Sequence, residues 1–325
     1  MRATEFGSVV MTVLRAENAA LVAEVHVAVG DLVAGGAIVV TTELMKMRHD
    51  LRAPMDARVV SVHVGVGDEL HGGEPLVTPK FDEFLLGVMA LPLADVSLTT
   101  NGQLLGRKRE VIRESGIKRI NVSLDTLNPM RFQQIARGGD LGTVLEGIDG
   151  LLADGIKVKI NMVPLRTQNH SDVLAMLDYC LDRGIELRYI ELMRMGHLVK
   201  GNAFQSDFIS MQSLLDIIAE KYEFARTDAP YDSTSVRFQV PGRGVFGVIA
   251  NESEPFCSSC TRLRLSSDGY LYGCLSSSRR QSISDLLDMP SHLALPKLQN
   301  ILVSALTDKK LAFEGEATVM KFIGG

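Results

Sequence analysis

The chain has 325 residues and a formal net charge of −5, which is enough length for about two domains with separate cores. The acidic balance argues against nucleic acid or an anionic membrane surface as a partner. The apolar runs are only of strand length, so the sequence predicts no membrane span. Four cysteines in so long a chain predict a reducing, cytoplasmic setting rather than a disulfide framework.

The first eighty residues contain an internal repeat. Residues 20–40 match residues 57–77 at a constant offset of 37, with 11 of 21 positions identical. Each copy has the pattern of a valine-rich strand, a Val-Gly-Asp turn, a Gly-Gly turn and a second short strand. Because two such units can cover each other's apolar side, we expect an all-β sandwich over residues 1–78.

The segment between the two copies contains a lysine flanked by methionines, Met45-Lys46-Met47. With the repeat around it, this motif resembles the biotinyl (biotin carboxyl carrier) domains. Lipoyl domains share the fold of this biotinyl/lipoyl family but usually carry Asp-Lys-Ala, so the motif favours biotin. The resemblance implies biotin on Lys46, at the hairpin that links the halves, with a biotin ligase and a carboxylase as partners. Leu44 and Ala57 depart from the family pattern and put recognition by the ligase in doubt. The alternative is a carrier fold that is never modified.

From residue 81 the pattern becomes an alternation of helices and strands. A helix is predicted from residue 81, and strands are predicted over 96–99, 119–124, 156–163 and 185–192. Helices are predicted between them, up to residue 115 and over 129–137, 141–154 and 171–183. This alternation predicts a parallel sheet covered by helices. The sites of such barrels lie at the carboxyl ends of the strands, where Thr99, Ser123, Asn161 and Met193 fall.

Each of these residues also has an ordinary structural interpretation. Thr99 suits the turn at Asn101-Gly102, Ser123 could be a core hydroxyl, and Met193 and Met195 are typical of packing. Lys157 and Lys159 lie on one face of a strand, which indicates either a solvated face or, inside a barrel, two ammonium groups aimed at an anion. Cys180 falls in a helical pattern and is predicted to be a small buried apolar residue.

Three cysteines near the C-terminal end have the spacing Cys-x2-Cys-x13-Cys, at Cys257, Cys260 and Cys274. Three thiolates can hold three irons of a cubane cluster and leave the fourth iron open. Arg262 and Arg264 follow the second cysteine at i+2 and i+4, so in an extended segment they share a face. Such a pair of guanidinium groups suits phosphate oxygens. The alternative is a structural zinc site with a fourth ligand such as His197.

Residues 79–325 resemble the molybdenum-cofactor GTP cyclases, a family of radical S-adenosylmethionine enzymes. The resemblance implies an α/β protein, with a partial radical-SAM (β/α) barrel over residues 79–225 and an iron–sulfur and GTP-binding region over 226–325. The motifs that carry it are Leu98-Thr99-Thr100-Asn101-Gly102, Ile120-Asn121-Val122-Ser123-Leu124-Asp125, Glu191-Leu192-Met193, Phe256-Cys257 through Arg264, Gly273-Cys274-Leu275 and the terminal Gly324-Gly325.

The resemblance also assigns roles to individual residues. Ser123 and Met193 would contact S-adenosylmethionine, as would Gly73, because Gly72-Gly73-Glu74-Pro75 resembles the Gly-Gly-Glu-Pro element of these enzymes. The three cysteines would carry an auxiliary 4Fe–4S cluster whose open iron faces the guanine, and the double-glycine tail would reach into the site. The residues implied to contact GTP are Thr99, Lys159, Arg262, Leu263 and Arg264.

The sequence departs from this family in one essential feature. The family binds its S-adenosylmethionine cluster with a Cys-x3-Cys-x2-Cys loop, but no cysteine precedes Cys180 here. Glu69 stands where the family has an arginine that contacts GTP. We therefore expect weak GTP binding and impaired turnover, and an open barrel edge that favours association, for example as a homodimer. The rival hypotheses are a biotin carrier with the remainder as scaffold, and a nucleotide-binding or structural cluster protein without turnover.

Overall fold

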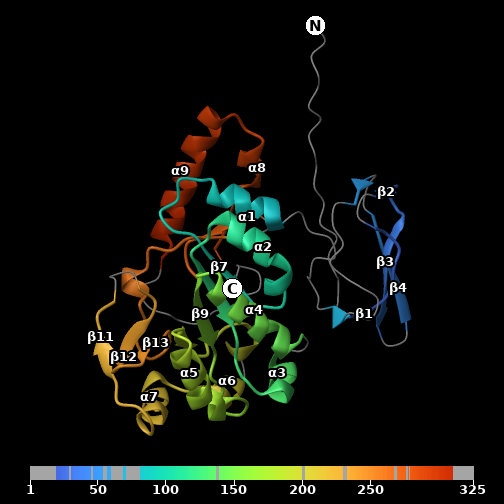
Figure 1. Cartoon of the computed structure of the whole chain (residues 1–325). Coiled ribbons are helices and arrows are strands. Elements are labelled where there is room, and N and C mark those ends of the chain that lie inside the picture. The colour runs from blue at the N-terminus through green and yellow to red at the C-terminus, as the bar shows by residue number, and fades with distance from the viewer. Residues whose placement is uncertain are drawn as a thin grey trace. The chain divides into compact units, whose positions relative to one another are not determined.

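The computed structural model describes residues 20–309, with gaps at 29–30, 45–46, 54–56, 60–68, 71–80, 137–138, 200–201, 230–232, 267–268, 276 and 278. The chain divides into two compact units. The first comprises Met1–Asp95 and Glu110–Gly116, and the second comprises Val96–Arg109 and Ile117–Gly325 (Figure 1).

The described strands of the first unit form two antiparallel sheets around an aliphatic core. The larger sheet has the order β4-β3-β1-β6, and the smaller one pairs β2 with β5. Val22, Val39, Val40 and Ala53 form the buried core. The helix α1 (Phe81–Met89) also belongs to this unit. The strands are β1 (Ala20–Val25), β2 (Leu32–Val33), β3 (Ile38–Leu44), β4 (Met47–Arg52), β5 (Ala57–Arg58) and β6 (Glu69–Leu70).

The two copies of the sequence repeat exchange strand partners in this unit. Ala20 of β1 lies opposite Leu70 of β6. The position equivalent to Ala20 in the second copy is Ala57 of β5, and the position equivalent to Leu70 in the first copy is Val33 of β2, since the offset is 37. Ala57 and Val33 also lie opposite each other. The first strand of each copy therefore pairs with the second strand of the other copy. The repeat is thus a pseudo-two-fold relation in the backbone as well as in the sequence.

The second unit is built on a seven-stranded sheet with the order β11-β12-β13-β10-β9-β8-β7. Its strands β7, β8, β9, β10 and β13 run parallel, and β12 and β11 are added antiparallel at one edge. The predicted parallel sheet is confirmed, with strand ends within two residues of those expected. The bounds are β7 (Ser97–Thr100), β8 (Arg119–Ser123), β9 (Lys157–Met162), β10 (Glu186–Ile190), β11 (Ala225–Thr227), β12 (Val236–Val240) and β13 (Gly244–Ile249).

Capping side chains and glycines set the ends of the connecting helices. Asp140 caps α4 by accepting the backbone N–H of Thr143 at 2.6 Å, and this bond lowers the pKa of Asp140. Gly155 follows α4 in the left-handed region, with φ +74°, as expected for a helix stop. In the part of the chain that the structure describes, no helix combines the length and apolar character of a membrane span. The helices are α2 (Leu105–Ser115), α3 (Pro129–Ala136), α4 (Leu141–Ala153), α5 (Val173–Asp182), α6 (Ala203–Asp207), α7 (Met211–Ala219), α8 (Ser284–Leu287) and α9 (Ser291–Thr307).

Alternation along the parallel strands gives the large sheet one apolar and one polar face. Ile120, Ile160 and Leu187 are fully buried on the apolar face, against which α4 and α5 pack (Figure 1). The Tyr189 side chain lies on the same face, and its hydroxyl donates to the carbonyl of Val173 at 2.8 Å. The one polar atom of this buried side chain therefore has a hydrogen-bond partner. The intervening positions carry polar and charged side chains on the other face.

A buried carboxylate joins the sheet to the segment that leads to the cysteines. Glu191, directly after β10, is only 2% exposed. It accepts the backbone N–H groups of Met211 at 2.7 Å, Glu252 at 2.9 Å and Ser253 at 2.9 Å, together with the Ser253 hydroxyl. One side chain therefore fixes the start of α7 and the turn before Phe256.

We predict that Glu191→Gln lowers the free energy of unfolding by about 3 kcal/mol, because the amide turns an N–H group toward buried donors and removes the charge that they stabilise. Urea denaturation followed by helical circular dichroism measures this. Glu220→Gln, at an exposed position, is the control and should change stability by less than about 0.5 kcal/mol. Equal unfolding midpoints for the two variants would contradict the role given to Glu191.

Candidate functional site

A short 3-10 turn and a small sheet bring the three cysteines together. Cys257–Ser259 form the turn, in which the Cys260 N–H donates to the Cys257 carbonyl at 3.2 Å. The chain then enters a three-stranded sheet of β14 (Arg264–Leu265), β15 (Tyr270–Tyr272) and β16 (Gln281–Ser282), which returns it to Cys274. Burial, followed by the neighbouring Cys274 and Cys260, raises the pKa of Cys257. The three thiols therefore share one electrostatic neighbourhood.

Cations surround the second of these thiols. The Cys260 sulfur lies 3.9 Å from Nη1 of Arg262 and 3.7 Å from Nζ of Lys309. Burial opposes ionisation, but the Arg262 backbone N–H, Lys309 and the Arg262 guanidinium outweigh it, so the pKa of Cys260 is lowered. The guanidinium of Arg264 interacts with Cys260 and Cys274, and burial lowers its pKa. Thiols beside cations are suited to act as thiolate ligands.

A zinc ion and a cubane cluster make different demands on the distances between the cysteine sulfurs. Among the described residues, no three His, Cys, Asp or Glu side chains could hold one metal ion. A zinc ion with Zn–S bonds of about 2.3 Å would need its cysteine sulfurs about 3.8 Å apart. A cubane cluster takes each cysteine on a different iron and has no such requirement. The side chain of His197, the suggested fourth zinc ligand, lies outside the described residues.

The polar face of the large sheet carries a connected hydrogen-bond network. Arg188 on β10 donates to Asn161 at 2.9 Å and to Asn121 at 2.8 Å, and Asn121 donates to the Thr99 hydroxyl at 3.1 Å. Arg188 lies opposite Asn161, and Thr99 lies opposite Asn121, whereas Asn161 itself lies opposite Ser123. The network therefore crosses four adjacent parallel strands with a shift of two residues between β8 and β9. Burial lowers the pKa of Arg188, and the neighbouring Arg119 lowers it further. The face is therefore rigid, partly dehydrated and cationic.

Lys159 lies on the same face beside a carboxylate that it shares with an arginine. Its Nζ is 3.1 Å from Oε2 of Glu186, and Arg237 donates to the same oxygen at 3.1 Å. Burial lowers the pKa of Lys159; Glu186 opposes this change, and Arg188 and Arg119 add to it. The ammonium of Lys159 therefore lies within a charge cluster, whereas Lys157 on the same strand is exposed to solvent.

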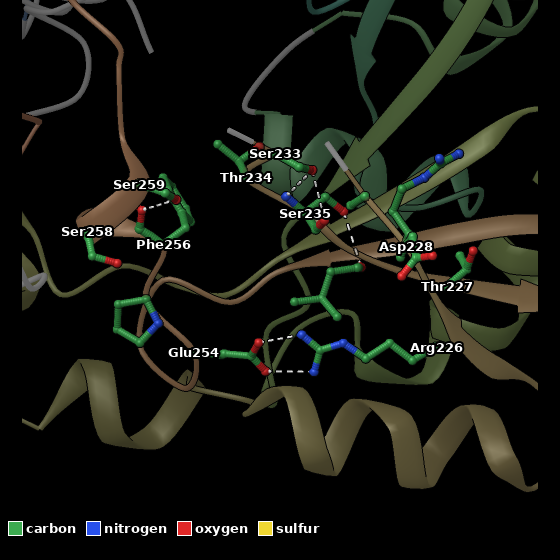
Figure 2. A pocket seen from close by; sticks show the side chains of 14 residues that line it. Arg226, Thr227, Asp228, Ser233, Thr234, Ser235, Glu254, Phe256, Ser258 and Ser259 are labelled. Atoms are coloured by element: carbon green, nitrogen blue, oxygen red, sulfur yellow. Dashed lines mark hydrogen bonds and ion pairs between the residues drawn. The ribbon is translucent and has the colours of Figure 1, made fainter. Parts of the chain in front are cut away.

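A pocket of about 390 Å³ lies where this cluster meets the cysteine loop. Phe256, Ser258 and Ser259 line one side of it, and β11 and the start of β12 line the other (Figure 2). Arg237 lines the pocket while its guanidinium reaches Glu186, so the pocket adjoins the polar sheet face. Arg226 at the opposite wall is bound to Glu254 through two hydrogen bonds, at 2.6 and 3.2 Å (Figure 2).

The remaining predicted residues have varied surroundings. Ser123 is exposed at the carboxyl end of β8, opposite Asn161, and is not a core hydroxyl. Met193 is half-buried, whereas Met195 is buried, as packing predicts. Cys180 is fully buried and its pKa is raised by burial, so its predicted core role is confirmed. Leu263 is half-buried beside the arginines. The predicted sites at Lys46, Gly73, Gly324 and Gly325 lie outside the described residues.

The sequence interpretation missed several residues of this region. Asn121, Arg188 and Arg237 occupy the polar face, and the alternation of Arg119 with Asn121 and of Glu186 with Arg188 could have revealed the first two. Arg237 lies on an antiparallel strand for which no pattern was recognised. Lys309 reaches the cysteines from the far end of α9, and nothing in its local sequence signals this.

Comparison with known proteins agrees with this arrangement. Residues 37–180 match the Radical SAM superfamily, beginning inside the internal repeat, and residues 185–314 match Molybdenum Cofactor Synthesis C. A GTP 3',8-cyclase of Synechocystis sp. is 34% identical over 234 residues, covering 68% of this chain and 71% of the relative. That of Listeria welshimeri is 35% identical over 233 residues, covering 70% and 68%. That of Aliarcobacter butzleri is 40% identical over 183 residues, covering 56% and 55%.

A solved structure of a single-chain, multi-domain long-chain acyl-CoA carboxylase is 19% identical and covers 57% of this chain and 24% of its own, with a TM-score of 0.20. That score is too low to bear on the fold. The parallel sheet and the two family matches define the chain as a radical S-adenosylmethionine protein of molybdenum cofactor biosynthesis. The chain is 34% and 35% identical to the relatives from Synechocystis sp. and Listeria welshimeri and covers 71% and 68% of their lengths, so it belongs to the GTP 3',8-cyclase family.

We predict that Gly273→Ala destabilises the cysteine region, because an added Cβ would lie 1.8 Å from the carbonyl oxygen of Ala305 in α9. Displacing backbone in this way costs about 1–3 kcal/mol, measured as a lower midpoint of urea unfolding. Gly106→Ala is the matched control, since a Cβ there meets nothing within 4 Å. If Gly273→Ala unfolded at the midpoint of the control, the close packing of Gly273 on α9 would be disproved.

Proposed function

We propose that residues 226–325 hold an auxiliary 4Fe–4S cluster through Cys257, Cys260 and Cys274, next to a GTP-binding site. The observation that carries this proposal is the Cys260 thiol flanked by Arg262 and Lys309, with the Arg264 guanidinium beside the same cysteines. When bound, such a cluster supplies one iron without a protein ligand, to which the guanine of GTP can coordinate.

The residues of this chain then have distinct tasks toward GTP. Arg262 and Arg264 bind phosphate oxygens through guanidinium forks, and Leu263 between them packs against the nucleotide. Thr99 and Lys159 contact the substrate from the polar sheet face, which Arg237 joins to the cysteine region. Lys159 is paired with Glu186, so a phosphate that binds here shares the ammonium with that carboxylate.

Three regions serve this function. We assign residues 1–78 to a carrier-like β domain, 79–225 to a truncated radical-SAM barrel and 226–325 to the cluster and GTP-binding region. Ser123 and Met193, at or beyond the carboxyl ends of β8 and β10, contact S-adenosylmethionine. The strand β7 is the edge of the described sheet. Association through that edge, for example as a homodimer, forms part of the proposal.

We further propose that turnover by this chain is impaired. Cleavage of S-adenosylmethionine needs an electron from a cluster held by three closely spaced cysteines, and residues 1–179 contain no cysteine. The substrate half is then a GTP-binding module that depends on another source of the radical.

We predict that the double variant Arg262→Met/Arg264→Met binds GTP about a hundred-fold more weakly than the wild type, because two charge-assisted contacts with phosphate are lost. Equilibrium dialysis with labelled GTP measures this. Arg243→Met, which removes an exposed arginine paired with Asp182, is the control and should bind as the wild type does. Unchanged affinity in the double variant would refute this placement of the triphosphate.

Incubation of the anaerobically reconstituted chain with dithionite, S-adenosylmethionine and GTP should yield no 5′-deoxyadenosine above a protein-free blank. Chromatographic detection of the nucleoside gives the result directly. A cyclase relative with its cysteine loop intact is the positive control. Robust 5′-deoxyadenosine from this chain would show that the interpretation of the missing cysteine loop is wrong.

A second candidate function is that of a biotin carrier with Lys46 as the attachment site, serving a carboxylase. The observation that favours it is the pseudo-two-fold exchange of strands in the first unit. Leu44 at the end of β3 lies opposite Met47 at the start of β4, so only Met45 and Lys46 connect the two strands. Lys46 itself lies outside the described residues.

We predict that co-expression with an active biotin ligase labels the wild-type chain on a streptavidin blot and that Lys46→Ala removes the label. The covalent bond needs the Lys46 amine, so no other lysine should substitute for it. Lys157→Ala, at an exposed lysine of the second unit, is the control and should remain labelled. An unlabelled wild type beside a labelled carrier standard would exclude the carrier function.

A further inference from the structure

Lys309 lies two residues beyond α9 and connects two chain segments that are far apart in sequence. Its ammonium donates to the carbonyl of Arg262 and to the carbonyl of Gly273, the latter at 3.0 Å. Its Nζ also lies 3.7 Å from the Cys260 sulfur. An ammonium group has three N–H donors, so these three partners use its full capacity.

The two carbonyls belong to the segments that carry the cysteines. Arg262 follows Cys260 by two residues, and Gly273 directly precedes Cys274. A single side chain therefore ties the Cys-x2-Cys segment to the third cysteine, although 13 residues separate them. Loss of this ammonium would leave two carbonyls and a thiolate to find other partners at the same time.

The position of Lys309 is itself fixed by the end of α9. Ala305, in the last turn of the helix, packs so closely on Gly273 that no Cβ fits between them. The Ser304 hydroxyl accepts from Gln281 of β16 at 2.6 Å. Asp308, the neighbour of Lys309, forms an ion pair with Arg279 at 2.8 Å. The end of α9 is thus attached both to Gly273 and to the segment that leads into β16.

We propose that Lys309 is a positioning residue of the cluster site, which clasps the two cysteine segments and places a positive charge beside the Cys260 ligand. This inference rests on the proposed function, because it takes the three cysteines to be cluster ligands. Reduction adds negative charge to a cluster, and a nearby cation stabilises the reduced form more than the oxidised one. Lys309 therefore raises the reduction potential and slows the loss of iron.

The test compares anaerobically reconstituted full-length wild type with Lys309→Met, Lys309→Arg and the control Lys297→Met. Lys297 is on the same helix, and its ammonium lies 3.6 Å from Met289 Sδ. EPR-monitored redox titration gives the midpoint potential, and an iron chelator gives the rate of cluster loss. We expect a lower potential and several-fold faster iron loss for Lys309→Met. Lys309→Arg should keep the wild-type potential because it keeps the charge, and Lys297→Met should match the wild type in both measurements.

Wild-type potential and iron loss in Lys309→Met would overturn the inference and leave the proposed cluster intact. A wild type that takes up no iron would instead overturn the proposed function, and the electrostatic role with it. Hydrogen exchange in the metal-free chain tests whether Lys309 holds the two cysteine segments together in the absence of a cluster. The same measurement applies to a variant that takes up no cluster. Faster amide exchange over residues 260–264 and 271–275 in Lys309→Met than in Lys297→Met supports the clasp, and equal exchange in both excludes it.

Discussion

The chain is negative overall, but the second unit gathers cationic side chains in two places, and its candidate site depends on them. The polar sheet face brings Lys159, Arg188 and Arg237 together around the single carboxylate of Glu186, with Arg119 within range. Burial disfavours the charged forms of Lys159 and Arg188, since it removes the water that would solvate them. Such a cluster is most stable when an anion is bound, and in the proposed function the phosphates of GTP would supply that charge.

A second group of cationic side chains lies beside the cysteines. Arg262, Arg264 and Lys309 interact with the cysteine side chains. A cysteine side chain is neutral as a free thiol and anionic when it binds a metal. Arg237 lines the pocket between the two regions, and Glu191 anchors the turn that leads from the sheet to Phe256. Substrate and cluster would therefore share one positively charged region of a single unit.

The sequence was sufficient to predict the parallel sheet, because the alternation of strand and helix patterns and helix stops such as Gly155 are local signals. The repeat predicted two units that pack against each other in the first unit, but it did not predict that the copies exchange strand partners. Contacts that depend on tertiary packing could not be predicted. Lys309 approaches Cys260 only because α9 packs on Gly273, and Arg237 approaches Glu186 only because β12 adds antiparallel to β13. Neither arrangement has a signature in neighbouring residues.

The central claim is that three cysteines hold a cluster with an iron open to GTP. The most direct measurement is the EPR spectrum of the reduced, anaerobically reconstituted chain, recorded with and without saturating GTP and accompanied by iron, sulfide and zinc analysis. We predict one 4Fe–4S cluster per chain and a spectrum that GTP changes, whereas inorganic triphosphate, which lacks the base, does not. Zinc in place of iron, or a cluster spectrum that saturating GTP leaves unchanged, would contradict the account.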